Sequence, residues 1–286
     1  MDANLSTQPF KHRENGPSIN AINFVKKLER LRQALEGLPV KPPSIYLDAH
    51  GVAQDEIINL QILVPPIGTL YLVDIKRLGT AALSATADNS ASLRSLLESK
   101  SIPKVGFDIR AVSKLLFRDF SVSLDGMYDL QLMELASRNG RHSKKHLAGF
   151  AKCVDQDVPK SNTTKSRWLQ PDDTTNMHLF NSLGYFPSMK RIELYPALWA
   201  VYRYRLSKPW QAFWLSSARA ESWQRVQGSK LGKVRQGEQS LGPTSWWSSE
   251  LLESAMECWN EEIFTERMAG DYELNEDAEW VPLSMK

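Results

Sequence analysis

The sequence has few cysteines, and this scarcity argues against two common ways of stabilising a protein. Its two cysteines, Cys153 and Cys258, lie far apart and form no Cys-x-x-Cys pair. A disulfide framework needs several cysteines, and a structural zinc site needs closely spaced cysteines or histidines. We therefore expect the 286 residues, 42% of them hydrophobic, to fold around an ordinary apolar core in a reducing, intracellular compartment, nuclear or cytoplasmic.

The sequence also lacks a long uninterrupted apolar segment. Its longest apolar stretch, residues 57–73, is interrupted by Asn59, Gln61 and the pair Pro65–Pro66. A membrane-spanning helix needs about 20 consecutive apolar residues. The polar N-terminus carries no apolar segment typical of a secretion signal. We expect two strands and a turn in this stretch, and no membrane partner.

Neither sign of charge dominates the whole chain, because the formal net charge is only +2. The charges are unevenly placed, however. Residues 141–235 carry 17 basic and six acidic residues, whereas residues 247–286 carry two basic and eleven acidic residues. These regions are either solvated surfaces of opposite sign or working surfaces. In the second case the basic region binds single-stranded RNA or DNA, and the acidic C-terminal tail covers it or binds a protein partner.

Hydrophobic spacing divides the chain into three parts. We predict a polar N-terminus and leading helix in residues 1–40, a main domain in residues 41–226, and a basic connector, helix and loose acidic tail in residues 227–286. In the main domain, apolar runs separated by turn residues predict a three-stranded antiparallel meander. Strands are expected over residues 44–50, 57–64, 69–75 and 103–107, helices over residues 22–35, 90–100, 108–120, 128–138, 144–154 and 193–226, and a long loop over residues 155–186.

A meander followed by a helix, a strand and more helices is the order of the ribonuclease-H-like α/β fold. The segments PPSIYLDAHGV, INLQILV, TLYLVDI, IPKVGFDIRAVSKLLF and GMYDLQLMELA, in this order, resemble the fungal branch of the DEDD-type 3′–5′ exonuclease domains. These are relatives of ribonuclease D and the Werner-type exonuclease. The resemblance implies a mixed sheet, an antiparallel meander plus parallel strands, flanked by helices, with a helical C-terminal extension. It also implies phosphodiester hydrolysis by two Mg²⁺ or Mn²⁺ ions held by four carboxylates.

Three of the four carboxylates of that pattern are replaced here. In the first motif Asp48 matches, but His50 stands where the family has glutamate. Val112 stands at the aspartate of the second motif, with Lys114 at the following acidic position. In the third motif Arg191 stands at the aspartate, and the segment before it is several residues short. The resemblance therefore favours a catalytically degenerate exonuclease domain with no cofactor, using Mg²⁺ or Mn²⁺ only if activity remains.

Two alternatives stay open. The first is an active 3′–5′ exonuclease with an altered metal site built from Asp48, His50, Asp108 or Asp129, against which an ion pair from Arg191 into the same space would count. The second is a protein-interaction scaffold that works through its acidic tail.

Each candidate residue also has a structural interpretation. Asp48 could bond to local backbone, His50 could pack at the mouth of a cleft, Asp108 could be the N-cap of a helix, and Asp129 could tie the following helix to the sheet. The residues that we predict to contact nucleic acid are Lys114, Lys144, Lys145, Arg191, Arg203 and Arg205. The aromatic residues between 195 and 214 are either stacking platforms or, for most of them, core.

Overall fold

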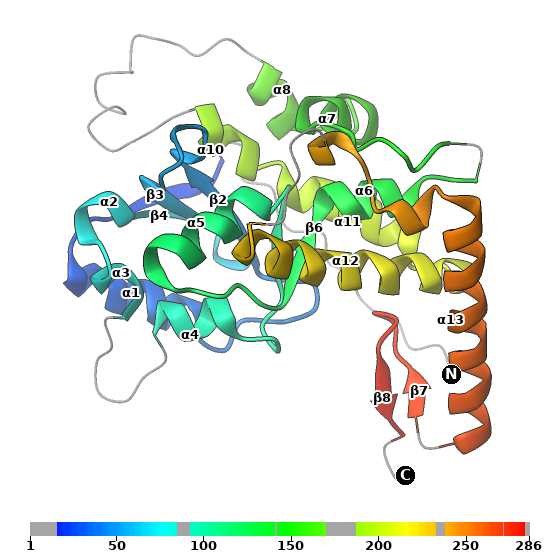
Figure 1. The fold of residues 1–286 in the computed structure, drawn as a ribbon. Coiled ribbons are helices and arrows are strands. Elements are labelled where there is room, and N and C mark those ends of the chain that lie inside the picture. The colour runs from blue at the N-terminus through cyan, green and yellow to red at the C-terminus, as the bar shows by residue number, and fades with distance from the viewer. Residues whose placement is uncertain are drawn as a thin grey trace, which may run out of the picture.

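A mixed six-stranded sheet forms the centre of the protein in the computed structural model (Figure 1). The structure describes residues 16–84, 92–140, 142–169, 187–232, 238–270 and 272–283. The strands are β1 (Ser18–Ile22), β2 (Ile45–His50), β3 (Asn59–Val64), β4 (Thr69–Asp74), β5 (Lys104–Gly106) and β6 (Met127–Asp129). They lie in the order β1-β4-β3-β2-β5-β6.

The pairing of the strands confirms the predicted fold class. β2, β3 and β4 form the antiparallel meander, and β5 and β6 extend it on the β2 side as parallel strands. Two short 3-10 helices, η1 (Val52–Gln54) and η2 (Pro65–Ile67), make the two turns of the meander. The sheet with its helices is therefore the ribonuclease-H-like mixed arrangement that the sequence predicts.

Helices cover both faces of the sheet, and the alternation of side chains along β2 shows why. Ile45, Leu47 and Ala49 point into one apolar cluster, and Tyr46 points into the other. The first cluster is closed by α1 (Val25–Leu35), α3 (Ala81–Ser84), α4 (Leu93–Glu98) and α5 (Arg110–Phe120). The second is closed by α6 (Leu130–Ser137), α7 (Phe150–Asp157), α11 (Tyr195–Leu206) and α12 (Ala212–Lys230).

The remaining elements lie around these two layers. The short helices are α2 (Ile75–Leu78), α8 (Thr163–Leu169), α10 (Pro187–Ile192), η4 (Pro209–Gln211), η5 (Glu238–Ser240) and η6 (Thr244–Trp246). The long helix α13 (Ser249–Ala269) stands at one side of the molecule beside a hairpin of β7 (Tyr272–Leu274) and β8 (Trp280–Pro282) (Figure 1). No helix among the described residues is long and apolar enough to span a membrane.

Several element predictions are wrong in detail, for tertiary reasons. Residues 18–22 form β1, a strand that the sequence does not predict, because they pair with β4 at the edge of the sheet, and the leading helix begins at Val25 instead of Ile22. Tyr128 and Asp129 belong to β6 because they pair with β5. The helix predicted over residues 144–154 begins only at Phe150. The acidic end is not loose, since its described part forms the β7–β8 hairpin.

Two further predictions concern the loop and the domain boundary. Part of the predicted loop 155–186 is helical, as α8, and the rest from residue 170 lies outside the described residues. Helix α12 continues across the predicted boundary at residue 226 and ends at Lys230. The three-part division of the chain remains a prediction.

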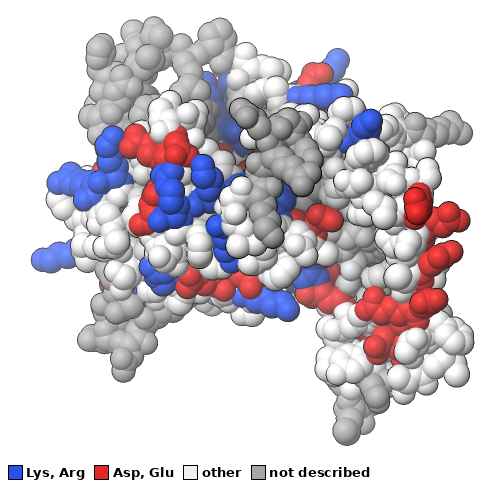
Figure 2. Space-filling model, viewed as in Figure 1, with Lys and Arg blue, Asp and Glu red and all other residues white. Residues whose placement is uncertain are grey.

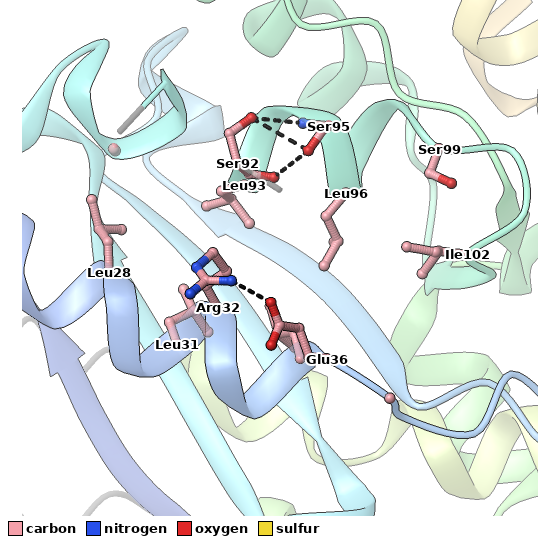
Figure 3. A pocket seen from close by; sticks show the side chains of 13 residues that line it. Leu28, Leu31, Arg32, Glu36, Ser92, Leu93, Ser95, Leu96, Ser99 and Ile102 are labelled. Atoms are coloured by element: carbon pink, nitrogen blue, oxygen red, sulfur yellow. Dashed lines mark hydrogen bonds and ion pairs between the residues drawn. The ribbon is translucent and has the colours of Figure 1, made fainter. Parts of the chain in front are cut away.

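An apolar cavity of about 410 Å³ lies between α1 and α4 (Figure 3). It is lined by Leu28, Leu31, Leu93 and Leu96, and the ion pair between Arg32 and Glu36 lies at its rim. All four leucines belong to the cluster into which Ile45 and Leu47 point, whereas the side chain of Asp48 shares its strand face with Tyr46. The cavity is therefore on the opposite side of the sheet from the motif residue Asp48.

Lys104 makes stability depend on pH. Its side chain is fully buried, and Nζ donates hydrogen bonds to the carbonyls of Leu96 (2.9 Å) and Ser99 (2.7 Å). Burial lowers the pKa of Lys104 to about 7, although Asp125 opposes this effect. An unfolded lysine titrates near pH 10.4. The stability that this group contributes is complete above that value and is lost as the pH falls towards 7.

We therefore expect the free energy of unfolding to rise from pH 7 to pH 9, with a contribution from Lys104 that approaches about 1.4 kcal/mol per pH unit above pH 8. Urea denaturation at pH 7, 8 and 9 measures the slope, and Lys104→Met should reduce it by that amount. Lys100→Met changes an exposed lysine of the same region and serves as the matched control. An unchanged slope in Lys104→Met would contradict the assignment.

Candidate functional site

Asp48 lies near the end of β2 and is buried, with 8% of the residue exposed. Its Oδ1 accepts a hydrogen bond from the backbone N–H of Ala49 (2.9 Å), and its Oδ2 accepts one from the Tyr195 hydroxyl (2.6 Å). Burial raises the pKa of the Asp48 carboxyl, against the opposing influence of Arg191 and Tyr195. The local backbone contact considered from the sequence is present, and Tyr195 and Arg191 add to it.

Arg191 occupies the space in front of this carboxylate. Its Nε lies 3.4 Å from Asp48 Oδ2 and donates a hydrogen bond to the Tyr195 hydroxyl (2.9 Å), while Nη2 donates to the Phe107 carbonyl (3.2 Å). Burial disfavours the charged guanidinium, but Tyr195 and Asp48 hold the pKa of Arg191 above its usual value. This is the ion pair that would count against a metal site built on Asp48.

Aromatic rings hold the Arg191 guanidinium in place. Its central carbon lies 5.4 Å from the centre of the Phe107 ring, 5.0 Å from that of Phe150 and 5.9 Å from that of Tyr195. Each of these distances allows a cation–π attraction. Arg191 belongs to α10. Because α10 packs against β2, tertiary packing brings the arginine to the end of this strand.

His50 shares the strand face of Asp48, as the alternation of the strand requires, and is half-buried. Burial lowers the pKa of His50, and Glu56 opposes this change. Gly51 follows with φ of 98°, and a Cβ at this position would lie 2.8 Å from the Glu56 carbonyl oxygen. Only glycine fits this turn, which places His50 at the rim of the site.

Asp129 is completely buried and organises the neighbouring strand end. It is the N-cap of α6 through the N–H of Gln131 (3.0 Å), and it also accepts hydrogen bonds from the N–H groups of Asp108 (2.9 Å) and Ile109 (3.1 Å). The Arg225 guanidinium donates a further bond to it (2.6 Å). The expectation that Asp129 ties the helix to the sheet is confirmed, and it also anchors the start of α5.

The prediction that Asp108 is the N-cap of α5 is wrong. Ile109 is the N-cap residue, because Asp129 takes up the N–H groups at this helix start. The Asp108 carboxylate instead forms a bidentate pair with Arg110, at 2.6 Å to Nε and 2.8 Å to Nη2. Burial would raise the pKa of Asp108, but Arg110, aided by Arg225 and Arg191, lowers it below the ordinary range.

The side chains of the second motif have structural roles. Val112 is half-buried and packs against the apolar cluster of α5. Lys114 is exposed, and its Nζ forms an ion pair with Asp55 (3.2 Å), to which Arg118 is also paired. Val112 offers no ligand, and Lys114 is already neutralised by a carboxylate of the same chain.

The other predicted nucleic-acid contacts are mostly engaged within the protein. Lys144 is buried, and its Nζ donates to the three carbonyls of Leu135, Ala136 and Arg138 at 2.9, 2.8 and 2.7 Å. Burial lowers its pKa to about 8. A surface role for Lys144 is therefore wrong, because its ammonium group caps the end of α6.

Three basic side chains remain nearer the surface. Arg203 pairs with Asp277 (3.1 Å) and Arg205 with Asp157 (2.7 Å). Lys145 is exposed and lies over the Trp247 ring, 4.9 Å from its centre. Of the predicted contacts, Lys145 is therefore the one exposed cation for which no ion pair appears within the described part of the chain.

The aromatic residues of α11 and α12 divide into two groups. Tyr195, Trp199 and Tyr202 are core, as expected for most of them. Tyr204, in the last turn of α11, and Trp210, in η4 between the two helices, are however 67% and 74% exposed. Lys208, which precedes η4, places Nζ 4.4 Å from the centre of the Tyr204 ring.

The geometry does not fit a divalent metal. Aspartates and arginines alternate through the site, since Asp48 faces Arg191, Asp108 faces Arg110, and Asp129 faces Arg225. Hard divalent cations are held by oxygen ligands, with one or two free carboxylates among them for Mg²⁺. No group of three or more His, Cys, Asp or Glu side chains among the described residues is arranged to hold a metal.

Sequence reasoning missed the partners that hold this network together. The sequence places Tyr195 and Arg225 in one predicted helix, residues 193–226, and gives no sign that either contacts Asp48 or Asp129. Tyr195 follows Arg191 by four residues, but α10 ends at Ile192 and α11 begins at Tyr195, so ordinary helical spacing does not pair them. Arg225 is almost 100 residues from Asp129 in sequence, and no local signal could have joined them.

Comparisons with known proteins agree on the fold. No protein-family model and no curated protein matches the sequence. Among solved structures, ribonuclease D from Trypanosoma brucei superposes with a TM-score of 0.56 and 17% identity, covering 85% of this chain and 83% of that chain. Its complex with the RNA U12 gives a TM-score of 0.56 and 15% identity, covering 80% and 78%. At this identity the similarity concerns the fold alone, which is the expected ribonuclease-H-like one.

Proposed function

We propose that this protein has the fold of a 3′–5′ exonuclease but no catalytic activity, and that it associates with single-stranded RNA or DNA without cutting it. The observation that supports the loss of activity is the Arg191 guanidinium, 3.4 Å from Asp48 Oδ2. Arginine does not lose its proton in proteins, so this position carries a permanent positive charge. The Tyr195 hydroxyl donates to Oδ2, and the guanidinium places its charge beside the carboxylate oxygen that a metal ion would need.

Electrostatics opposes a metal at this position. Two unit charges 4 Å apart interact by about 4 kcal/mol at an effective dielectric constant of 20, and a divalent ion doubles this to about 8 kcal/mol. A two-metal mechanism needs several anionic ligands to hold its cations together. Here Val112 replaces one such ligand with an apolar side chain, and both oxygens of Asp129 accept hydrogen bonds.

The nucleic-acid part of the proposal is supported by the exposed turn between α11 and α12. Tyr204 and Trp210 present large aromatic surfaces, and Lys208 supplies a cation beside them. Exposed rings with interleaved cations bind single strands by base stacking and phosphate attraction. The RNA in the ribonuclease D complex is consistent with this partner class, although that structure shows similarity of fold only.

The test uses single-stranded RNA and DNA oligonucleotides labelled at the 5′ end. They are incubated with the protein and Mg²⁺ or Mn²⁺ at low and at high salt. We expect binding that weakens steeply as salt rises and no shortening of the oligonucleotide, because phosphate contacts release counterions. Trp210→Ala should weaken binding at least about five-fold, since a base–aromatic stack is worth about 1–3 kcal/mol. Trp223→Ala removes another exposed tryptophan, on α12, and is the matched control.

Two results would overturn the proposal. Metal-dependent shortening from the 3′ end that Asp48→Ala abolishes would establish an active exonuclease with an altered site. Absence of binding to both oligonucleotides at low salt would remove the association with nucleic acid.

A further inference from the structure

Helix α13 exposes one whole face along its length. Its half-buried residues Leu252, Ala255, Trp259 and Ile263 follow helical spacing and face the rest of the protein. The Trp259 ring packs edge-on against Phe213 of α12, with 6.1 Å between ring centres. The helix is therefore anchored by one face, and the opposite face is turned to solvent.

The solvent face carries a row of residues that we call the outer row: Glu253, Glu257, Glu261, Phe264 and Met268. Steps of four, four, three and four residues place them on one side of a helix. All are exposed, with Phe264 at 68% and Met268 at 74%. Figure 2 shows acidic side chains gathered along α13 at the right-hand side of the molecule. An acidic segment of about two turns thus runs directly into an apolar one.

This arrangement is unfavourable for a helix with no partner. Like charges four residues apart repel along the helix surface. The carboxylates of Glu253, Glu257 and Glu261 form no ion pair with any residue that the structure describes, unlike most carboxylates around Asp48. Phe264 and Met268 leave large apolar surfaces in water. A cationic and apolar partner would relieve both costs at once.

We propose that the outer row is a docking surface for a basic amphipathic segment of a partner protein. Lysine or arginine side chains would lie against the three glutamates, and an apolar side chain would lie on Phe264 and Met268. From Glu253 to Met268 the helix rises about 22 Å, which matches about four turns of a partner helix. The inference is independent of nucleic-acid binding by the rest of the chain.

Charge distinguishes this partner from two other occupants. A nucleic acid would bring phosphates against three glutamates, which repels it. A second copy docking by the same face would set the glutamates against each other or, in an antiparallel contact, against Phe264 and Met268, and neither arrangement supplies a cation. A basic protein segment meets neither obstacle.

The test uses the full chain and a fluorescent 18-residue helical peptide made of lysine and leucine. We expect saturable binding that weakens with salt. The double variant Phe264→Ser and Met268→Ser should weaken peptide binding at least about ten-fold. The triple variant with Gln at Glu253, Glu257 and Glu261 should weaken peptide binding too and remove most of its salt dependence. Leu251→Ser, an exposed residue of α13 outside the row, should bind as the unchanged chain does. A peptide of glutamate and leucine should not bind.

Circular dichroism of each variant checks that α13 is retained. Equal peptide binding by the unchanged chain and the outer-row variants would overturn the proposal. Self-association in sedimentation that the outer-row variants abolish would assign the face to a second copy and would also overturn it. If single-stranded RNA displaced the peptide while the outer-row variants still bound the peptide as the unchanged chain does, the peptide would bind elsewhere. That result would reject this surface.

Discussion

Replacing Asp129 with alanine is expected to destabilise the folded protein by about 3–5 kcal/mol, because it leaves a buried cation and several backbone N–H groups without a partner. Asp129 is completely buried and accepts hydrogen bonds from Asp108, Ile109, Gln131 and Arg225. These partners belong to the start of α5, the start of α6 and the side of α12. One carboxylate therefore joins three helices at the end of β6.

Urea denaturation followed by circular dichroism measures this loss of stability. Asp119→Ala removes an exposed carboxylate that is paired with Arg118, and we expect it to cost less than about 1 kcal/mol. Adding Arg225→Met to Asp129→Ala should recover part of the loss, because no unpaired guanidinium then remains buried. An Asp129→Ala protein as stable as the Asp119→Ala control would show that this carboxylate does not hold the helices together.

The second large effect concerns Asp48 and Arg191, and we expect their substitutions to be strongly non-additive. Arg191→Met alone should cost about 2–3 kcal/mol, since it leaves the Asp48 carboxyl buried beside only Tyr195 and the Ala49 N–H. Asp48→Asn alone should also destabilise, since the guanidinium among the aromatic rings loses its counter-charge. The double variant should be less destabilised than the sum, with a coupling of about 1–3 kcal/mol.

A double-mutant cycle of unfolding free energies measures this coupling directly. Lys190→Met, next to Arg191 on α10, combined with Asp48→Asn gives a matched cycle for a neighbouring cation, and its two effects should add. If the changes in unfolding free energy at Asp48 and Arg191 add to within about 0.5 kcal/mol, the guanidinium is not stabilised by the carboxylate. The Arg191→Met protein should also be tested for nuclease activity, and we expect none because Val112 still offers no ligand.

The sequence predicts the fold well because its signals are local. Alternating apolar residues over 44–50 and 57–64 can be satisfied by strands with one face on each core, and the turns after them contain glycine and proline. The ends of elements are less well predicted, because pairing decides them. Residues 18–22 are a strand only because β4 offers a free edge, and Tyr128 is in a strand only because β5 lies beside it.

The sequence likewise predicts the residue types of the site but not the contacts between them. The motif comparison predicts from sequence alone that Asp48 stands without the usual acidic neighbours, with His50, Val112 and Arg191 in their places. It does not predict that Arg191 reaches Asp48, nor that Tyr195 lies between them. It also places Lys144 on the surface, whereas α6 buries the ammonium group against three carbonyls.

The sequence by itself determined which chemical groups this protein has at the end of β2, and therefore which it lacks. Ligand chemistry depends on residue type, so the sequence alone shows that positions 50, 112 and 191 carry a histidine, a valine and an arginine and no carboxylate. Only the tertiary structure decided what the remaining charges do. Ion pairs depend on distances between segments far apart in the chain, and these distances convert Asp48, Asp108 and Asp129 from candidate ligands into partners of Arg191, Arg110 and Arg225.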